Sequence, residues 1–146
     1  MKSVLIFSLV TLCAFASHAK QCETVDVKVE LAAISAEGVS SGDIVLAARK
    51  LEGIKKIDIN NCIAQRRTFN QADAAFATAY YRASADSEIK NLLKTITLLK
   101  EAATDPSIPE LKRVLIPGAI KRAENELREK QIFYNDTLKY IENATR

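Results

Sequence analysis

The sequence is poor in the residues on which many enzyme active sites depend. It has no tryptophan, one histidine and one methionine among 146 residues. The histidine, His18, stands inside the N-terminal leader described below, so an exported form would lack it. Without histidine, a Ser-His or Cys-His nucleophile pair and a histidine metal ligand are excluded. Phosphate-binding glycine loops are also missing from the sequence. We therefore predict a protein that is not an enzyme and has no cofactor.

The first nineteen residues have the pattern of a secretory signal peptide. Lys2 is followed by an apolar and small-residue run over residues 4–16, and Ser17-His18-Ala19 places small residues at −3 and −1. The pattern predicts a signal peptide at 1–19 and a single domain at 20–146. The domain lacks a second apolar run of about twenty residues, so we predict no transmembrane span in it. The expected location is periplasmic or secreted.

Two of the three cysteines, Cys22 and Cys62, follow the predicted cleavage point. An even number of cysteines in an oxidising compartment favours a disulfide, and two cysteines allow one pairing. The alternative is two separate buried thiols. A disulfide here would close a loop of about forty residues and stabilise the fold by about 3–4 kcal/mol.

Charge gives little reason to expect a nucleic-acid or metal partner. The formal net charge is +3 at pH 7, and basic and acidic residues are interspersed. Proteins that bind nucleic acid usually have a clustered basic face, which interspersed charges do not form. The densest acidic group is Glu124, Glu126 and Glu129, which fits a solvated helix face. Di-metal carboxylate bundles need Glu-x-x-His on two helices, so no metal site is predicted.

Apolar periodicity predicts an all-α protein. Residues 25–31 fit both a strand and a helix, and we favour a helix because no later segment offers a sheet partner. The only strong breaks in the rest of the chain come from glycine, proline and short polar residues. We expect them at 38–42, 55–60, 86–87, 104–109 and 117–118.

The last helix has a regular apolar stripe. Ile120, Leu127, Tyr134 and Ile141 recur every seven residues, which is typical of a bundle or coiled-coil seam. With only four glycines and no tandem repeat, the predicted architecture is an antiparallel helical bundle of four to five helices.

Two adjacent aromatic pairs are candidates for a binding surface. In the pairs Tyr80-Tyr81 and Phe133-Tyr134, neighbouring side chains diverge around the helix, so one can enter the core while the other stays near the surface. Exposed aromatic residues commonly anchor interfaces. We predict a partner surface of Tyr81, Phe133, Asn135 and Asp136. For Asn135 and Asp136 we favour the alternative, in which one of them caps or bridges to a neighbouring helix end. Asn135 and Asn143 also begin N-glycosylation patterns, whose use the sequence leaves open.

The C-terminal third resembles the LemA family of bacterial helical proteins. The resemblance rests on Leu98-Leu99, the Asp105-Pro106 break, Glu124-Asn125 followed by Leu127, and Tyr134-Asn135-Asp136 followed by Leu138. The family's Lys/Arg-Arg-x-Asp-Leu-Ile-Pro type motif has no counterpart here. The resemblance implies an antiparallel helical bundle, membrane association and no established catalytic residues.

These observations predict an exported, non-enzymatic helical-bundle protein that acts as an envelope-associated interaction protein, with an unidentified envelope protein as partner. The alternative is a periplasmic carrier that holds a small apolar ligand between its helices. The residues that would line such a carrier site are Phe69, Phe76, Leu92, Ile96 and Tyr134.

Overall fold

The protein is all-α, as predicted, with its helices packed in antiparallel pairs. A computed structural model describes residues 20–145, and the predicted signal peptide at 1–19 lies outside that range. Within it no helix is long and apolar enough to cross a bilayer. The helices of this range are α1 Val27–Ala36, α2 Ser41–Ala64, α3 Gln71–Thr104, α4 Glu110–Arg113 and α5 Ile116–Ala144.

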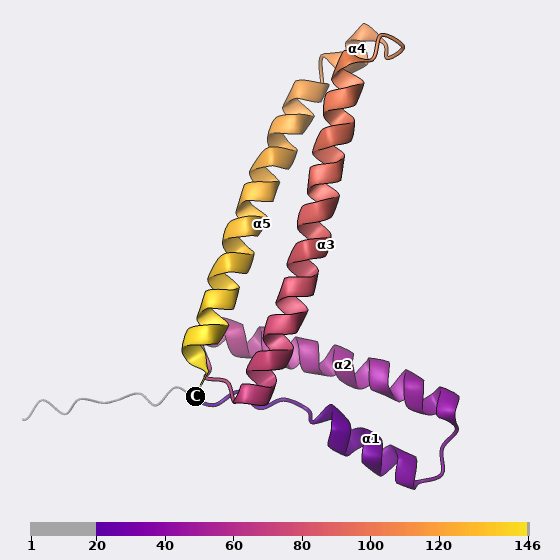
Figure 1. Cartoon of the computed structure of the whole chain (residues 1–146), viewed down its shortest axis with the longest axis vertical. Helices are drawn as coiled ribbons and strands as arrows, with labels where there is room; N and C mark the ends of the chain where they lie inside the picture. The colour runs from indigo at the N-terminus through magenta and orange to yellow at the C-terminus, as the bar shows by residue number, and fades with distance from the viewer. Residues whose placement is uncertain (1–19, 146) are drawn as a thin grey trace, which may run out of the picture.

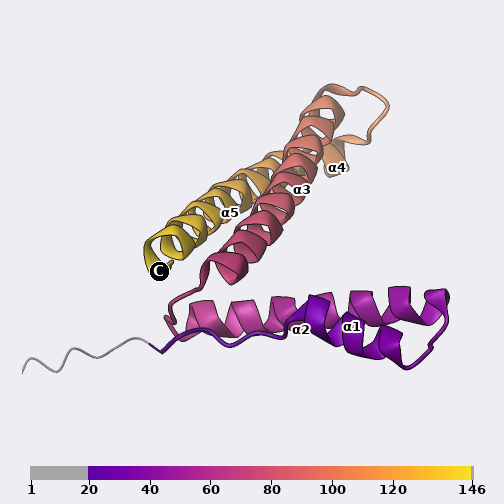
Figure 2. The same ribbon diagram turned by 60° about the horizontal axis from the view of Figure 1, so that its bottom comes forward.

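The helices form two hairpins that meet at one end (Figure 1). The long hairpin pairs α3 with α5, and the short α4 lies at its far end, which we call the tip. The second hairpin pairs α1 with α2 and lies across the opposite end of the long hairpin, which we call the base (Figure 2). A helix rises about 1.5 Å per residue, so the 34-residue α3 extends about 51 Å from base to tip.

The ambiguous segment at 25–31 is helical from Val27 onward. Asp26 caps α1 because its carboxylate accepts hydrogen bonds from the backbone N–H groups of Lys28 and Val29 at 3.0 and 3.2 Å. The helix stops before Gly38, whose φ of 75° lies in the left-handed region that glycine tolerates. Ser40 then caps α2, accepting from Asp43 N. The predicted break at 38–42 is therefore confirmed.

The predicted turn at 55–60 is wrong, because α2 continues through it to Ala64. That segment contains neither glycine nor proline, and Ile59 is completely buried against the long hairpin. Packing of this face outweighs the turn preference of its Asp and Asn residues. The chain turns later, at 65–70, where Arg66 adopts a φ of 54° and Asn70 caps α3.

The boundary predicted at Asp86-Ser87 is also wrong, because α3 is continuous across it. Both residues are exposed, while Ala85 and Ile89 beside them belong to the core or pack against it. The break at 104–109 is confirmed, since α3 ends at Thr104. The break predicted at Pro117-Gly118 falls slightly earlier, between α4 and α5, with Pro117 in the first turn of α5.

The core is concentrated at the base. It contains the disulfide, Ile59 from α2, the fully buried Phe69 and Ile141, and a row of alanines from α3. In the predicted stripe of α5, Tyr134 and Ile141 are buried and Ile120 and Leu127 are half-buried. The stripe therefore faces α3, and it is most deeply buried toward the base.

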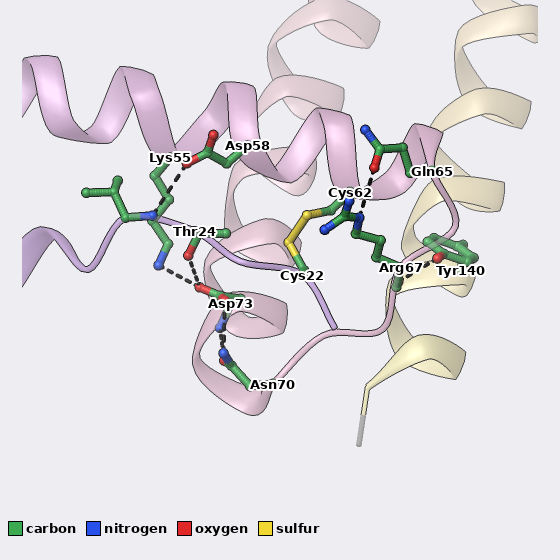
Figure 3. Close-up of a disulfide and its surroundings, with 11 residues drawn as sticks. Cys22, Thr24, Lys55, Asp58, Cys62, Gln65, Arg67, Asn70, Asp73 and Tyr140 are labelled. Atoms are coloured by element: carbon green, nitrogen blue, oxygen red, sulfur yellow. Dashed lines mark hydrogen bonds and ion pairs between the residues drawn. A yellow bond between two sulfur atoms is a disulfide. The ribbon is translucent and has the colours of Figure 1, made fainter. Parts of the chain in front are cut away.

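The predicted disulfide joins Cys22 to Cys62, with the two Cα atoms 5.5 Å apart (Figure 3). It ties the segment before α1 to the C-terminal end of α2. Backbone hydrogen bonds continue this connection, because Cys22 N donates to Thr68 O at 2.7 Å and Phe69 N donates to Ala144 O at 2.9 Å. The loop at 65–70 is thus held between the beginning and the end of the described chain.

Asp73 is the polar centre of the base (Figure 3). Its buried carboxylate accepts from Lys55 Nζ and Thr24 Oγ1, each at 2.7 Å, and from Asn70 Nδ2 at 2.9 Å. Asn70 Oδ1 in turn accepts from Asp73 N at 2.8 Å, which caps α3. One carboxylate therefore connects the N-terminal segment, α2 and the start of α3.

Candidate functional site

A hollow of about 480 Å³ opens where the C-terminal end of α2 meets α3 and α5. We call it the aromatic pocket. Four of its side chains are aromatic, and the others are small, apolar or polar. Its lining residues are Asn60, Ile63, Ala64, Tyr80, Tyr81, Ser84, Glu88, Lys130, Phe133 and Tyr134.

The four rings of the aromatic pocket form one connected cluster. The centroids of Tyr80 and Tyr81 are 5.1 Å apart, and those of Phe133 and Tyr134 are 5.3 Å apart. Tyr81 joins the two pairs, 6.3 Å from both Phe133 and Tyr134. These separations are favourable for edge-to-face or tilted aromatic packing. Tyr81 and Tyr134 are buried, whereas Phe133 remains 52% exposed.

Helix positions explain why this cluster forms. Tyr80 and Tyr81 are consecutive residues of α3, and Phe133 and Tyr134 are consecutive residues of α5. Because α3 and α5 are antiparallel partners, the two pairs meet at the same level of the hairpin. The hydroxyl of Tyr81 donates to Asn60 Oδ1 at 2.7 Å, which fixes its ring against α2.

An ion pair connects α3 to α5 at the aromatic pocket. Lys130 Nζ lies 2.8 Å from Glu88 Oε2, and both side chains are partly exposed. Hydrogen bonding from Lys130 and from Tyr134 lowers the pKa of Glu88 below its usual value. Burial, and then the hydrogen bond to Glu88, raises the pKa of Tyr134 to about 12. Glu88 is therefore charged and Tyr134 neutral at pH 7.

The two buried phenols of the aromatic pocket are poor general bases at neutral pH. Burial raises the pKa of Tyr81 as well, so both buried phenols hold their protons at neutral pH. A general base is most effective when its pKa is near the operating pH. Among residues 20–145 we find no group of three or more potential ligands that could hold a metal ion. An aromatic floor with a partly exposed ring suits an apolar or aromatic side chain of a partner.

A second hollow of about 310 Å³ adjoins the aromatic pocket. Phe133, Ile63 and Ala64 line both hollows, while Asp136 and Tyr140 line only the second. Phe133 therefore stands between the two hollows. We call these two hollows and the Phe133 ring between them the Phe133 surface.

The four residues predicted to form a partner surface differ in their exposure and in the hollow that they line. Phe133 and Asp136 are exposed and line the same hollow. Tyr81 is buried, so its prediction as an exposed residue is wrong, although it forms part of the aromatic pocket. Its ring turns inward because it packs against both aromatic residues of α5. Asn135 is exposed but lines a different hollow, with Thr78.

The alternative role for Asn135 and Asp136 was a cap or bridge to another helix. Among the described residues we find no hydrogen bond made by either side chain. Tyr134, which belongs to the core, is the one buried residue of the triplet Tyr134-Asn135-Asp136. The first two residues of the triplet therefore face different surroundings.

The residues predicted to hold a small apolar ligand do not share one cavity in the described chain. Tyr134 lines the aromatic pocket, but Phe76 lines another hollow, with Lys55 and Asp73. Phe76 and Ile96 are twenty residues apart on α3, which is about 30 Å along the helix. One small ligand cannot contact both.

Several residues of the site gave no signal in the sequence. Glu88 and Lys130 were unremarkable helix-surface charges, and Asn60 belonged to the wrongly predicted turn. Each becomes part of the aromatic pocket through its partner on another helix. The adjacent aromatic pairs Tyr80-Tyr81 and Phe133-Tyr134 were the one feature of the sequence that pointed to this site. All four residues line the aromatic pocket.

Comparison with known proteins found no matching family model, no matching curated protein and no matching solved structure. The resemblance of the C-terminal third to the LemA family therefore stays a prediction.

Proposed function

We propose that this protein is an exported, non-enzymatic interaction protein of the cell envelope, periplasmic or secreted, which binds a protein partner at the Phe133 surface. The observation that carries the proposal is the exposed Phe133 ring between two adjoining hollows. An aromatic side chain at such a position has large apolar area available to a partner. Interface hot spots are enriched in such aromatic anchors.

Export is supported by two independent features. The leader pattern of residues 1–19 is one. The other is the Cys22–Cys62 disulfide, which is compatible with an oxidising compartment outside the cytoplasm. The proposed relationship to the LemA family, which rests on the Tyr134-Asn135-Asp136 triplet and its neighbours, agrees with an envelope location.

A carrier of a small apolar ligand is the second candidate. The volume of the aromatic pocket, about 480 Å³, favours it because this value is within the range of small-molecule sites. The carrier would use the aromatic pocket alone. Native mass spectrometry of the purified protein separates the two functions, because a carrier retains a bound small molecule and an interaction protein does not.

Recovery of partners from the source cell envelope tests the proposed function. The variant is Phe133→Ser, and Ile132→Ser is its matched control because Ile132 is the neighbouring residue, is 54% exposed and does not line either hollow. We expect the same envelope protein with the wild type and with Ile132→Ser, and its loss with Phe133→Ser. Equal recovery with all three proteins would reject the Phe133 surface as the binding site.

A further inference from the structure

The tip of the long hairpin has an exposed apolar face far from the aromatic pocket. Leu111, Val114 and Leu115 are 84%, 71% and 70% exposed. No other large hydrophobic side chain in the part of the chain that the structure describes is as exposed as these three. They belong to α4 and the turn that joins it to α5.

The three side chains lie on one side of a helical segment. Their spacing is i, i+3 and i+4, which places them on the same helix face. Backbone hydrogen bonds keep the segment helical, because Val114 N donates to Glu110 O and Leu115 N donates to Lys112 O, each at 3.1 Å. The tip therefore presents a continuous apolar face and not three scattered side chains.

Basic residues outnumber acidic residues in the sequence around this face. Residues 105–122 contain four basic side chains and two acidic ones. The segment therefore has a formal charge of +2, which includes the negative charge of Asp105, whose Oδ1 accepts from Ser107 N at 2.8 Å. The basic residues are Lys112, Arg113, Lys121 and Arg122.

An apolar face with basic neighbours is the chemistry of a segment that rests in a membrane interface. Anionic lipid headgroups attract the basic side chains, while the aliphatic side chains enter the acyl boundary. Protein interfaces are enriched in aromatic anchors, and residues 105–122 contain no aromatic residue. The charge and composition of the tip therefore favour an anionic lipid surface over a protein.

The geometry of the hairpin makes the tip accessible (Figure 1). The tip lies at the end opposite the base. The base contains the disulfide and Lys20, whose carbonyl oxygen accepts from Thr68 N at 3.1 Å. Tyr134 and Ile116 are eighteen residues apart on α5, which is about 27 Å along the helix. The tip can contact a flat surface while the Phe133 surface stays open to a partner.

We propose that the tip, residues 110–115 with their basic neighbours, binds the surface of an anionic lipid bilayer by inserting Leu111, Val114 and Leu115 into its interface. This inference goes beyond the proposed function, because it concerns a second surface and does not require Phe133.

Co-sedimentation with lipid vesicles tests the proposal. The disulfide-bonded exported protein, with its N-terminus determined by mass spectrometry, is mixed with phosphatidylcholine vesicles with and without phosphatidylglycerol. We expect binding to the phosphatidylglycerol vesicles that weakens with added salt. Replacement of the apolar face by Leu111→Ser, Val114→Ser and Leu115→Ser together lowers the partition coefficient roughly tenfold or more, because both apolar and electrostatic contacts contribute to interfacial binding.

The matched control removes the same number of exposed apolar side chains elsewhere. Val45→Ser, Leu46→Ser and Ile57→Ser together change α2, where these residues are also exposed. The control protein is expected to bind like the wild type. Equal loss in both triple variants, or no vesicle binding by the wild type, would overturn the proposal. Lost self-association of the tip variant in analytical ultracentrifugation, with vesicle binding unchanged, would identify the tip as a contact between copies instead.

The absence of tryptophan from the sequence allows a direct test of insertion. Leu115→Trp introduces a single indole at the tip, and Leu46→Trp introduces one on α2 as the control. We expect the tip fluorophore to shift to shorter wavelength with phosphatidylglycerol vesicles and to be quenched by brominated acyl chains. A tip fluorophore that behaves like the α2 control would show that the tip does not insert.

Discussion

Single polar residues hold the base together. Asp73 illustrates this, because its buried carboxylate receives hydrogen bonds from Lys55, Thr24 and Asn70. A buried ion pair adds little stability compared with well-packed apolar residues, but removal of one partner leaves an uncompensated buried charge. The effect of changing Asp73 therefore depends on whether Lys55 is kept or is replaced at the same time.

Asp73→Ala is expected to lower the free energy of unfolding by about 3–5 kcal/mol, because Lys55 then keeps a buried charge without its partner. Urea unfolding measures the change. The exposed Asp86→Ala on the same helix is the control, with an expected change within about 0.5 kcal/mol. Adding Lys55→Met to Asp73→Ala should restore part of the loss. No recovery in the double variant would contradict the ion-pair explanation.

Tyr134 makes the stability depend on pH in the alkaline range. Burial raises its pKa in the folded protein to about 12, above the ordinary value of 10.0. The unfolded chain therefore releases this proton at lower pH than the folded protein does. The contribution of Tyr134 to stability is complete below pH 10 and is lost as the pH rises from about 10 to about 12.

Unfolding titrations from pH 8 to pH 12 check this expectation. Tyr134→Phe has no proton to lose at this position, so its stability should fall less steeply over the same range. Burial also raises the pKa values of Tyr81 and Tyr140, and the hydrogen bond to Glu88 raises that of Lys130, so these groups contribute to the decline that remains. Parallel curves for the wild type and Tyr134→Phe would exclude Tyr134 as a source of the pH dependence.

Sequence patterns predicted single residues well where one residue type decides the outcome. The Cys22–Cys62 pairing followed from the two cysteines that remain after the predicted leader and from the predicted export. Tyr81 was misplaced because a helical pattern says which positions share a face, but it does not say how wide the buried face is. Tyr81 packs against Phe133 and Tyr134 of α5, so the buried face of α3 is wide enough to include it.

At the scale of elements, sequence predicted helices reliably and their ends less so. Breaks that contain glycine or proline, at 38–42 and 104–109, occur where expected. The polar segments at 55–60 and 86–87 were wrongly predicted as breaks because Asp, Asn and Ser favour turns only when packing does not oppose them. Ile59 and Ala85 are buried at these levels, and their burial keeps α2 and α3 continuous.

Ile141 tests whether the seven-residue stripe of α5 is the packed face of that helix. Ile141→Ala is expected to destabilise the protein by about 2–5 kcal/mol, because this side chain is completely buried in the core. Ile132→Ala makes the same chemical change on an exposed part of α5 and should have a much smaller effect. Thermal or urea unfolding compares the two variants. Similar losses for both would show that the stripe is not the packed face.

At the scale of the whole molecule, the all-α antiparallel fold was predictable, but its division into two hairpins was not. The periodicity identifies apolar faces without saying which face meets which. The core gathers at the base, where the disulfide, the Asp73 cluster and the 65–70 loop connect segments distant in sequence. The aromatic pocket arises at the same junction, so it too depends on contacts that no single segment encodes.

Removal of the disulfide is expected to weaken this junction. Cys22→Ser with Cys62→Ser opens a connection between residues forty positions apart, which corresponds to about 4 kcal/mol on the chain-entropy account. The loss should appear as a lower midpoint of urea unfolding. Tyrosine near-UV circular dichroism in the folded baseline reports whether the aromatic pocket survives. An unchanged midpoint would show that the base is stable without this link.

Site-specific photo-crosslinking in the source cells tests the central claim most directly. A photoreactive residue replaces Phe133 in one protein and Ile132 in the other, two neighbouring positions of similar exposure. We expect one envelope protein to crosslink at position 133 and to crosslink weakly or not at all at position 132. Equal crosslinking at both positions, or none at either, would contradict the claim that the Phe133 surface binds a protein partner.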